Sequence, residues 1–103
     1  MIAREAAQPV TVAALYRIAR FTNCQGLRPP LESLCRQHDV RGTLVLALEG
    51  INGTIAGTGK AVTIVLTHIG GLPDCTDLEV KLSSATEMPF HRMKVRIKRE
   101  RSS

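Results

Sequence analysis

Hydrophobic residues follow two different periodicities along this 103-residue chain, and the order of these periodicities limits the fold. Some segments show the alternation or the short apolar run of a β-strand, and two others carry apolar residues at helical spacing. The strand-like segments are residues 10–21, 43–48, 54–56, 78–82 and 91–98. With a helix after the first and third of them, the order is that of an α+β, ferredoxin-like sandwich (βαββαβ) with an extra C-terminal strand. We expect an antiparallel sheet with two helices on one face.

Both helical segments are bounded by residues that suit helix ends. Pro29-Pro30 fits the first turn of the first helix, which should end near Asp39 after a loop at 23–26. Thr58 fits the N-cap of the second helix, which Gly70-Gly71 should end. The apolar stripes consist of Leu31, Leu34, Cys35 and His38 in the first helix, and Val62, Val65, Leu66 and Ile69 in the second.

A glycine-rich break at 49–53 predicts a hairpin between the second and third strands. Its turn has two candidate centres. Asn52-Gly53 is a good pair for a tight turn of the type that suits hairpins. Alternatively, Gly50 reverses the chain and Asn52 points from the third strand.

Length and composition indicate one domain with an aliphatic core. We place it at residues 10–99, with a flexible N-terminus at 1–9 and a tail at 100–103. Tyr16, Phe21 and Phe90 are the only aromatic residues, so base-stacking platforms are scarce and aromatic recognition of RNA is not expected. Apolar runs are too short for a membrane span, and three cysteines without a CxxC pair suggest reduced thiols, which together predict a soluble cytoplasmic protein.

Basic residues are concentrated at the C-terminal end. Residues 1–90 carry eight basic and eight acidic side chains, whereas the last 13 residues hold six basic side chains and one acidic. In the last predicted strand, one face is basic and the other can pack on a core. The basic face consists of Arg92, Lys94, Arg96 and Lys98. It suits a polyanion such as a nucleic-acid backbone, but it equally suits an edge strand protected by charge against aggregation.

Other polar groups give no complete catalytic or metal site. Glu49 and Asn52 form the densest polar pair, either to orient a ligand or a partner domain, or simply as hairpin residues. The three histidines lack metal-ligand spacing, and we expect no metal and no cofactor in this chain. Cys35 falls on the apolar stripe and should be core, while Cys24 and Cys75 fall in predicted loops and could be exposed.

Two strings resemble the rhodanese-related tRNA uridine hydroxylases: Thr43–Gly57 (TLVLALEGINGTIAG) and Met88–Val95 (MPFHRMKV). Tyr16 and the Lys81-x-Ser83 pair fit the same pattern, so the resemblance covers about residues 10–100. Members of that family join an N-terminal acylphosphatase-like domain to a rhodanese domain and perform oxygen-dependent 5-hydroxylation of the wobble uridine of tRNA. The matched polar positions are Glu49, Asn52, Arg92 and Lys94.

The resemblance implies an accessory N-terminal domain that helps to seat tRNA or supports the rhodanese domain. The family's catalytic cysteine lies in the rhodanese domain, so no residue here inherits that role, and we expect no activity from this chain alone. One alternative is a purely structural domain that binds a protein partner. A free-standing acylphosphatase is the other, but the segment Thr22–Arg28 has an arginine without that enzyme family's phosphate-loop pattern.

Overall fold

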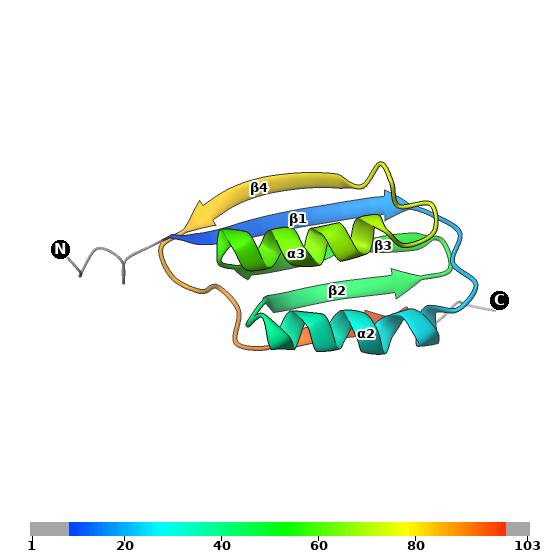
Figure 1. Ribbon diagram of the computed structural model, residues 1–103, viewed down its shortest axis with the longest axis horizontal. Helices are drawn as coiled ribbons and strands as arrows, with labels where there is room; N and C mark the ends of the chain where they lie inside the picture. The colour runs from blue at the N-terminus through cyan, green and yellow to red at the C-terminus, as the bar shows by residue number, and fades with distance from the viewer. Residues whose placement is uncertain (1–8, 99–103) are drawn as a thin grey trace.

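A computed structural model describes residues 9–98 and confirms the predicted order of elements (Figure 1). The elements are β1 (Val10–Ile18), α2 (Cys24–Gln37), β2 (Arg41–Ala47), β3 (Gly50–Gly57), α3 (Gly59–Gly70), β4 (Glu79–Ala85) and β5 (Met93–Ile97). Apart from Pro9, the predicted flexible N-terminus lies outside the described residues, as does the tail at 100–103.

The five strands form one sheet in the order β4-β1-β3-β2-β5. The pairs within the first four strands are antiparallel, but β5 runs parallel to β2, so the expectation of an antiparallel sheet was wrong at this edge. The connection after β4 explains the difference. Ala85 pairs with Val10, at the end of the sheet where β2 also begins, and the chain crosses along that end before Met93 pairs with Gly42 (Figure 1).

Both helices cover the same face of the sheet, as predicted, and the core lies beneath them (Figure 1). The largest side chains of this core are fully buried. They come from the strands (Leu44, Leu46, Ile51, Ile55), from α2 (Leu31, Cys35) and from α3 (Val62, Val65, Ile69). The predicted N-cap of α3 is confirmed, because the Thr58 hydroxyl accepts a hydrogen bond of 3.1 Å from the Ala61 N–H.

Helix α2 begins earlier than the prolines suggested. The Asn23 side chain caps it by accepting a 3.0 Å hydrogen bond from the Gly26 N–H, so the predicted loop at 23–26 is mostly helix. Pro29 and Pro30 therefore lie inside the helix, where each lacks the N–H that an interior residue donates. The positions are exposed, so water can satisfy the carbonyls that lose a donor.

Two strands also differ in extent or burial. β1 ends at Ile18 rather than at Phe21, because Ala19 and Phe21 donate their N–H groups to the hairpin-turn carbonyls of Glu49 and Leu48. β4, predicted to be half-buried, is exposed along almost its whole length. It is an edge strand outside the cover of α3, and it leaves Leu82 63% exposed.

Glycines allow β3 to lie very close to its neighbours. The hairpin turn consists of Leu48 and Glu49, so Asn52 belongs to the strand, as in the second sequence alternative, but Gly50 begins β3 rather than reversing the chain. Gly53 has φ +151°, and a Cβ there would lie 2.1 Å from the Thr43 carbonyl oxygen. Gly50 has φ +146° and approaches the Arg17 carbonyl in the same way. An L side chain would fit neither position.

Candidate nucleic-acid interface

The predicted basic strand forms a free edge of the sheet. In β5, Met93 and Val95 are buried, while Lys94 and Arg96 are exposed and point to the sheet face opposite the helices. Arg92 and Lys98 lie just before and just after this strand and are also exposed. The alternation predicted from the sequence therefore holds in the structure.

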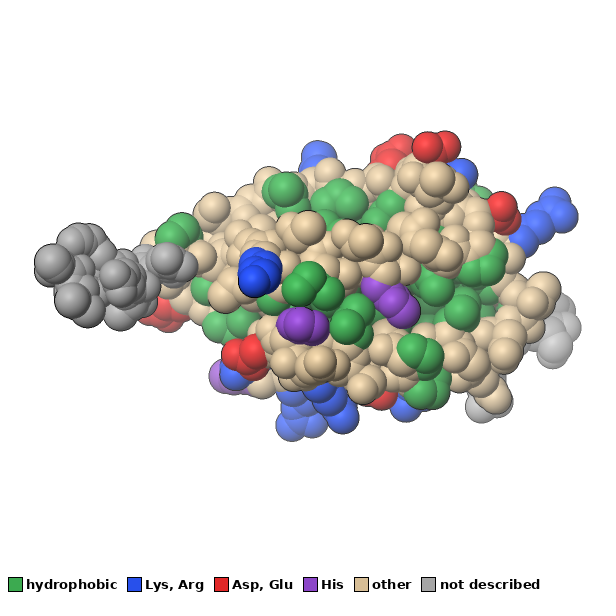
Figure 2. All heavy atoms as spheres, in the orientation of Figure 1, with side chains coloured by type: hydrophobic (Ala, Val, Ile, Leu, Met, Phe, Trp, Pro, Cys, Tyr) green, Lys and Arg blue, Asp and Glu red, His purple; other side chains and the backbone are tan. Residues whose placement is uncertain are grey.

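Helix α2 adds two further cations to this edge. A groove of about 570 Å³ runs between α2 and β5. The charged residues along it are Arg28, Glu32 and Arg36 from α2, and Arg92, Lys94 and Arg96 at β5. The side chains of Lys94 and Arg96 leave β5 on the opposite face of the sheet, so they border the groove at the sheet edge. In Figure 2, Lys and Arg side chains gather along the margin of the molecule on the α2 side.

Glu32 is the single carboxylate among the groove residues. Its Oε2 lies 3.2 Å from Nη2 of Arg36, and its Oε1 lies 3.9 Å from Nε of Arg28. The five cations thus exceed the acidic charge by four. The sequence did contain a signal for the helix part, because Arg28, Glu32 and Arg36 follow one another at a spacing of four and so share a helix face. The contribution of this face was missed.

Glu49 and Asn52 do not form a joint site. Glu49 lies in the hairpin turn, where its Oε2 is 3.6 Å from Nζ of Lys98. Asn52 is exposed on β3, and its cross-strand partners are Tyr16 and Val45. Lys98, predicted as a binding residue, therefore has an acidic neighbour. Within residues 9–98, the other three basic-face residues form no ion pair.

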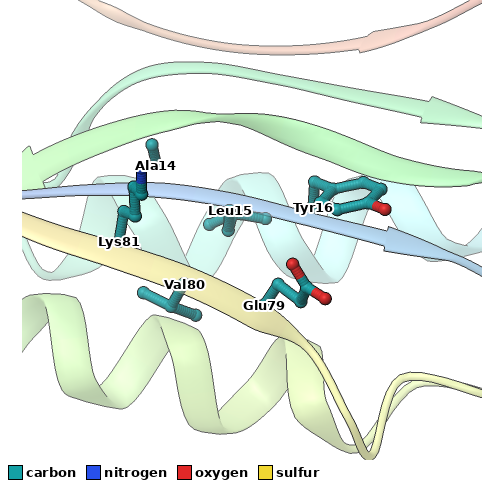
Figure 3. Close-up of a pocket in the computed structure, with 6 residues that line it drawn as sticks. All are labelled: Ala14, Leu15, Tyr16, Glu79, Val80 and Lys81. Carbon is teal, nitrogen blue, oxygen red and sulfur yellow. The ribbon is translucent and has the colours of Figure 1, made fainter.

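The face of the sheet away from the helices is open. Every second residue of each strand faces it, and a shallow hollow of about 270 Å³ lies along β1 and β4. In Figure 3, Glu79 extends towards the ring of Tyr16, and Lys81 lies beside Ala14. Tyr16 is 49% exposed here.

The cysteines are poor candidates for chemistry. Cys35 is core, as predicted, but Cys24 and Cys75 are buried too, which corrects the expectation that they could be exposed. Burial raises the pKa of all three thiols, that of Cys35 to about 11. They are therefore protonated at neutral pH, and a protonated thiol is a weak nucleophile. Among residues 9–98, no cluster of His, Cys, Asp or Glu suits a metal ion.

The segment that would have to serve as an acylphosphatase phosphate loop has a different structure here. Asn23 caps α2, Gly26 lies in its first turn, and Arg28 is directed to Glu32. Only Thr22 and Asn23 of the segment Thr22–Arg28 lie outside α2, too few residues to form a loop that surrounds a phosphate. In the part of the chain that the structure covers, no helix is long and apolar enough to cross a membrane.

The fold and the sheet order define an acylphosphatase-like α+β domain. Within that class, this chain belongs to the family of the UPF0176 acylphosphatase-like domain, whose model matches residues 10–100. This membership confirms the resemblance seen in the sequence. Among solved structures, acylphosphatase from Bacillus subtilis covers 84% of this chain and 97% of its own, with a TM-score of 0.64 and 14% identity. Klebsiella pneumoniae BlrP1 covers 88% of this chain and 24% of its own, with a TM-score of 0.69 and 17% identity. At such identities the likeness shows the fold alone.

Curated relatives are much more similar in sequence. A tRNA uridine(34) hydroxylase of Mesorhizobium japonicum is 56% identical over 93 residues, which are 90% of this chain. The tRNA uridine(34) hydroxylase of Brucella anthropi is 55% identical over 92 residues, or 89% of this chain. In both cases the match spans only 30% of the relative's length.

Proposed function

We propose that this chain is an accessory domain of a tRNA uridine hydroxylase, and that the groove between α2 and β5 seats tRNA by its phosphates. The observation that carries the proposal is the excess of cations in that groove, on a domain of the family to which relatives named tRNA uridine(34) hydroxylase are 52–56% identical. The hydroxylation itself belongs to a rhodanese domain, which is the proposed protein partner. The proposed location is the cytoplasm.

The electrostatic argument rests on where the charge lies. Because residues 1–90 are neutral as a whole, a phosphate backbone is attracted to one edge of the domain rather than to its entire surface. Cations along a strand repeat every second residue, about 6.5–7 Å apart, and α2 supplies a second row. Each phosphate that is neutralised releases a condensed counterion, so binding should weaken steeply as salt rises. Such contacts position the RNA and carry little sequence information.

The test is tRNA binding as a function of salt, with charge variants at β5. Reversal of Lys94 and Arg96 to Glu should abolish most of the affinity for tRNA at low salt. A finer comparison uses Lys94→Gln against Lys60→Gln, because Lys60 is also exposed but lies at the start of α3. Loss of one phosphate contact should make the slope of log K against log salt shallower by about 0.7–0.9 for Lys94→Gln. Lys60→Gln should leave it unchanged.

Two results would contradict the proposal: tRNA affinity that survives the double reversal, or equal slopes for the two glutamine variants.

The alternative function, a structural domain that binds a protein partner, has its own supporting observation. Ile18 is 70% exposed and Leu48 is 48% exposed, and both lie at the end of the sheet that holds the β2–β3 turn. That alternative predicts binding to a separately produced rhodanese domain without affinity for tRNA.

A further inference from the structure

Tyr16 stands on the open face of the sheet, away from the cationic groove. It projects from β1, which has neighbours on both sides in the sheet. Small side chains adjoin it along and across the strands: Ala14 precedes it by two positions, and Thr54 pairs with Ala14. The ring is therefore accessible beside the hollow of about 270 Å³ (Figure 3). A half-exposed aromatic ring with free space at its side is a surface on which a flat ligand can stack.

Polar groups flank this ring on both neighbouring strands. Asn52 pairs with Tyr16 from β3, and Glu79 pairs with it from β4. Directly paired side chains lie about 4.5–5.5 Å apart at Cβ, within reach of a ligand stacked on the ring. The Asn52 amide offers donors and an acceptor, and the Glu79 carboxylate accepts. Together they match the hydrogen-bonding edge of a nucleobase.

Positive charges lie at the two margins of the same face. Lys81 projects from β4, and Lys94 projects from β5 in the same row, with Ala14, Thr54 and Thr43 between them. Four strand spacings separate these two lysines, or about 19 Å. Arg96 adds a second cation at the β5 margin, while the single acidic residue of the β strands on this face, Glu79, stands beside Tyr16. Phosphates are thus favoured at the margins and disfavoured next to the ring.

We propose that the open face binds an unpaired segment of RNA, in which one base stacks on Tyr16 and is hydrogen-bonded by Asn52 and Glu79. The phosphates of that segment lie against Lys81 at one margin and against Lys94 and Arg96 at the other. This inference rests on the proposed function and specifies its substrate as single-stranded rather than fully paired RNA. Scarce aromatic residues exclude a row of stacked bases, but one exposed ring is enough for one base.

Tyr16 is the only tyrosine of the chain, which gives a direct probe. Protein labelled with fluorotyrosine has a single fluorine resonance in NMR. We expect unpaired oligouridylate to shift this resonance strongly, because a stacked base adds its ring current. Inorganic polyphosphate, which binds the cations but has no bases, should shift it little. A fully paired RNA duplex should also shift it little, since its bases are not available for stacking.

Affinity measurements with two variants complete the test. Tyr16→Ala should lower the affinity for oligouridylate at least about fivefold, the effect of losing one stacked base. Tyr16→Phe keeps the ring and should bind like the wild type, and affinity for the duplex should be the same in all three proteins. Because Tyr16 is exposed, circular dichroism should show the same fold throughout.

The outcomes separate this inference from the function on which it rests. If Tyr16→Ala binds oligouridylate as tightly as the wild type while Lys94→Gln still reduces the salt slope for tRNA, the stacking site is refuted and the proposed function stands. If no RNA binds the wild type, both fail. A resonance that shifts with a separate rhodanese domain but not with oligouridylate refutes the RNA site and assigns the face to a protein partner.

Discussion

Gly53→Ala provides a sharp test of how the central hairpin is built. The new Cβ would lie 2.1 Å from the Thr43 carbonyl oxygen and 2.8 Å from the Leu44 Cα, and both neighbours belong to the backbone of β2. Neither can rotate away as a side chain would. The backbone of residue 53 also has φ +151°, which L residues rarely adopt. The substitution therefore forces either a strained backbone or a separation of the two strands.

The expected loss of stability follows from these two terms. A non-glycine residue in a sparsely populated backbone region costs about 1–3 kcal/mol. Inserting a carbon into a closely packed place costs about another 1–3 kcal/mol. Small domains are stable by only about 5–15 kcal/mol, so the total of about 2–6 kcal/mol is a large part of that. For a domain of this size we expect Tm to fall by about 10 °C or more.

Thermal unfolding followed by circular dichroism measures the effect, with Gly59→Ala as the matched control. A Cβ at Gly59 meets only the Thr11 hydroxyl at 3.5 Å, an ordinary contact, and the residue begins α3. Alanine is the better helix former, so this variant should be as stable as the wild type or slightly more stable. A Gly53→Ala protein that unfolds within a few degrees of the Gly59→Ala protein would refute the reasoning.

Two further predictions concern a cap and a thiol. Thr58→Ala removes the acceptor for the Ala61 N–H and should destabilise the fold by about 1 kcal/mol in urea unfolding, whereas Thr58→Ser should keep most of the stability; equal loss in both variants would exclude the hydroxyl as the cause. Burial raises the pKa of the Cys35 thiol to about 11, so the folded state holds a proton that the unfolded chain releases. The free energy of unfolding should therefore decline between about pH 9 and pH 11, and more steeply than in Cys35→Ala. The same pH dependence in both proteins would contradict this prediction.

Periodicity was enough to predict the order of the elements, because each strand and each helix has its own apolar pattern. It failed where a local signal competed with another. At the start of α2, the proline pair suggested a first turn, but the Asn23 cap lies upstream and exposed prolines are tolerated within the helix. In β4, alternation indicated one buried face, yet alternation alone does not tell an edge strand from an inner one. The exposure of Leu82 depends on α3 stopping short of that edge.

The candidate site was likewise predicted only in part from the sequence. The basic face of β5 was readable from the sequence because Lys94 and Arg96 belong to one strand. Arg28 and Arg36 were not assigned to it, since they approach β5 only because that strand adds in parallel next to β2, beneath α2. The parallel pairing of β5 with β2 depends on the path of the chain after β4, and no local sequence pattern predicts that path. The position of Tyr16 opposite Asn52 likewise required the strand register.

Much of the string Thr43–Gly57, which resembles the hydroxylase family, is explained by backbone packing, and Asn52 is the member of it that faces the open side of the sheet beside Tyr16. Gly50 and Gly53 let β3 approach its neighbours, and the Glu49 carboxylate lies beside Lys98 at the turn. Apart from Asn52, the residues that we propose to bind RNA lie outside this string. A protein with these glycines but without Lys94 and the other cations of the groove would keep the fold, and our proposal predicts that it would not bind tRNA. Family membership therefore establishes the scaffold of this chain, and binding by the exposed side chains is the property to measure.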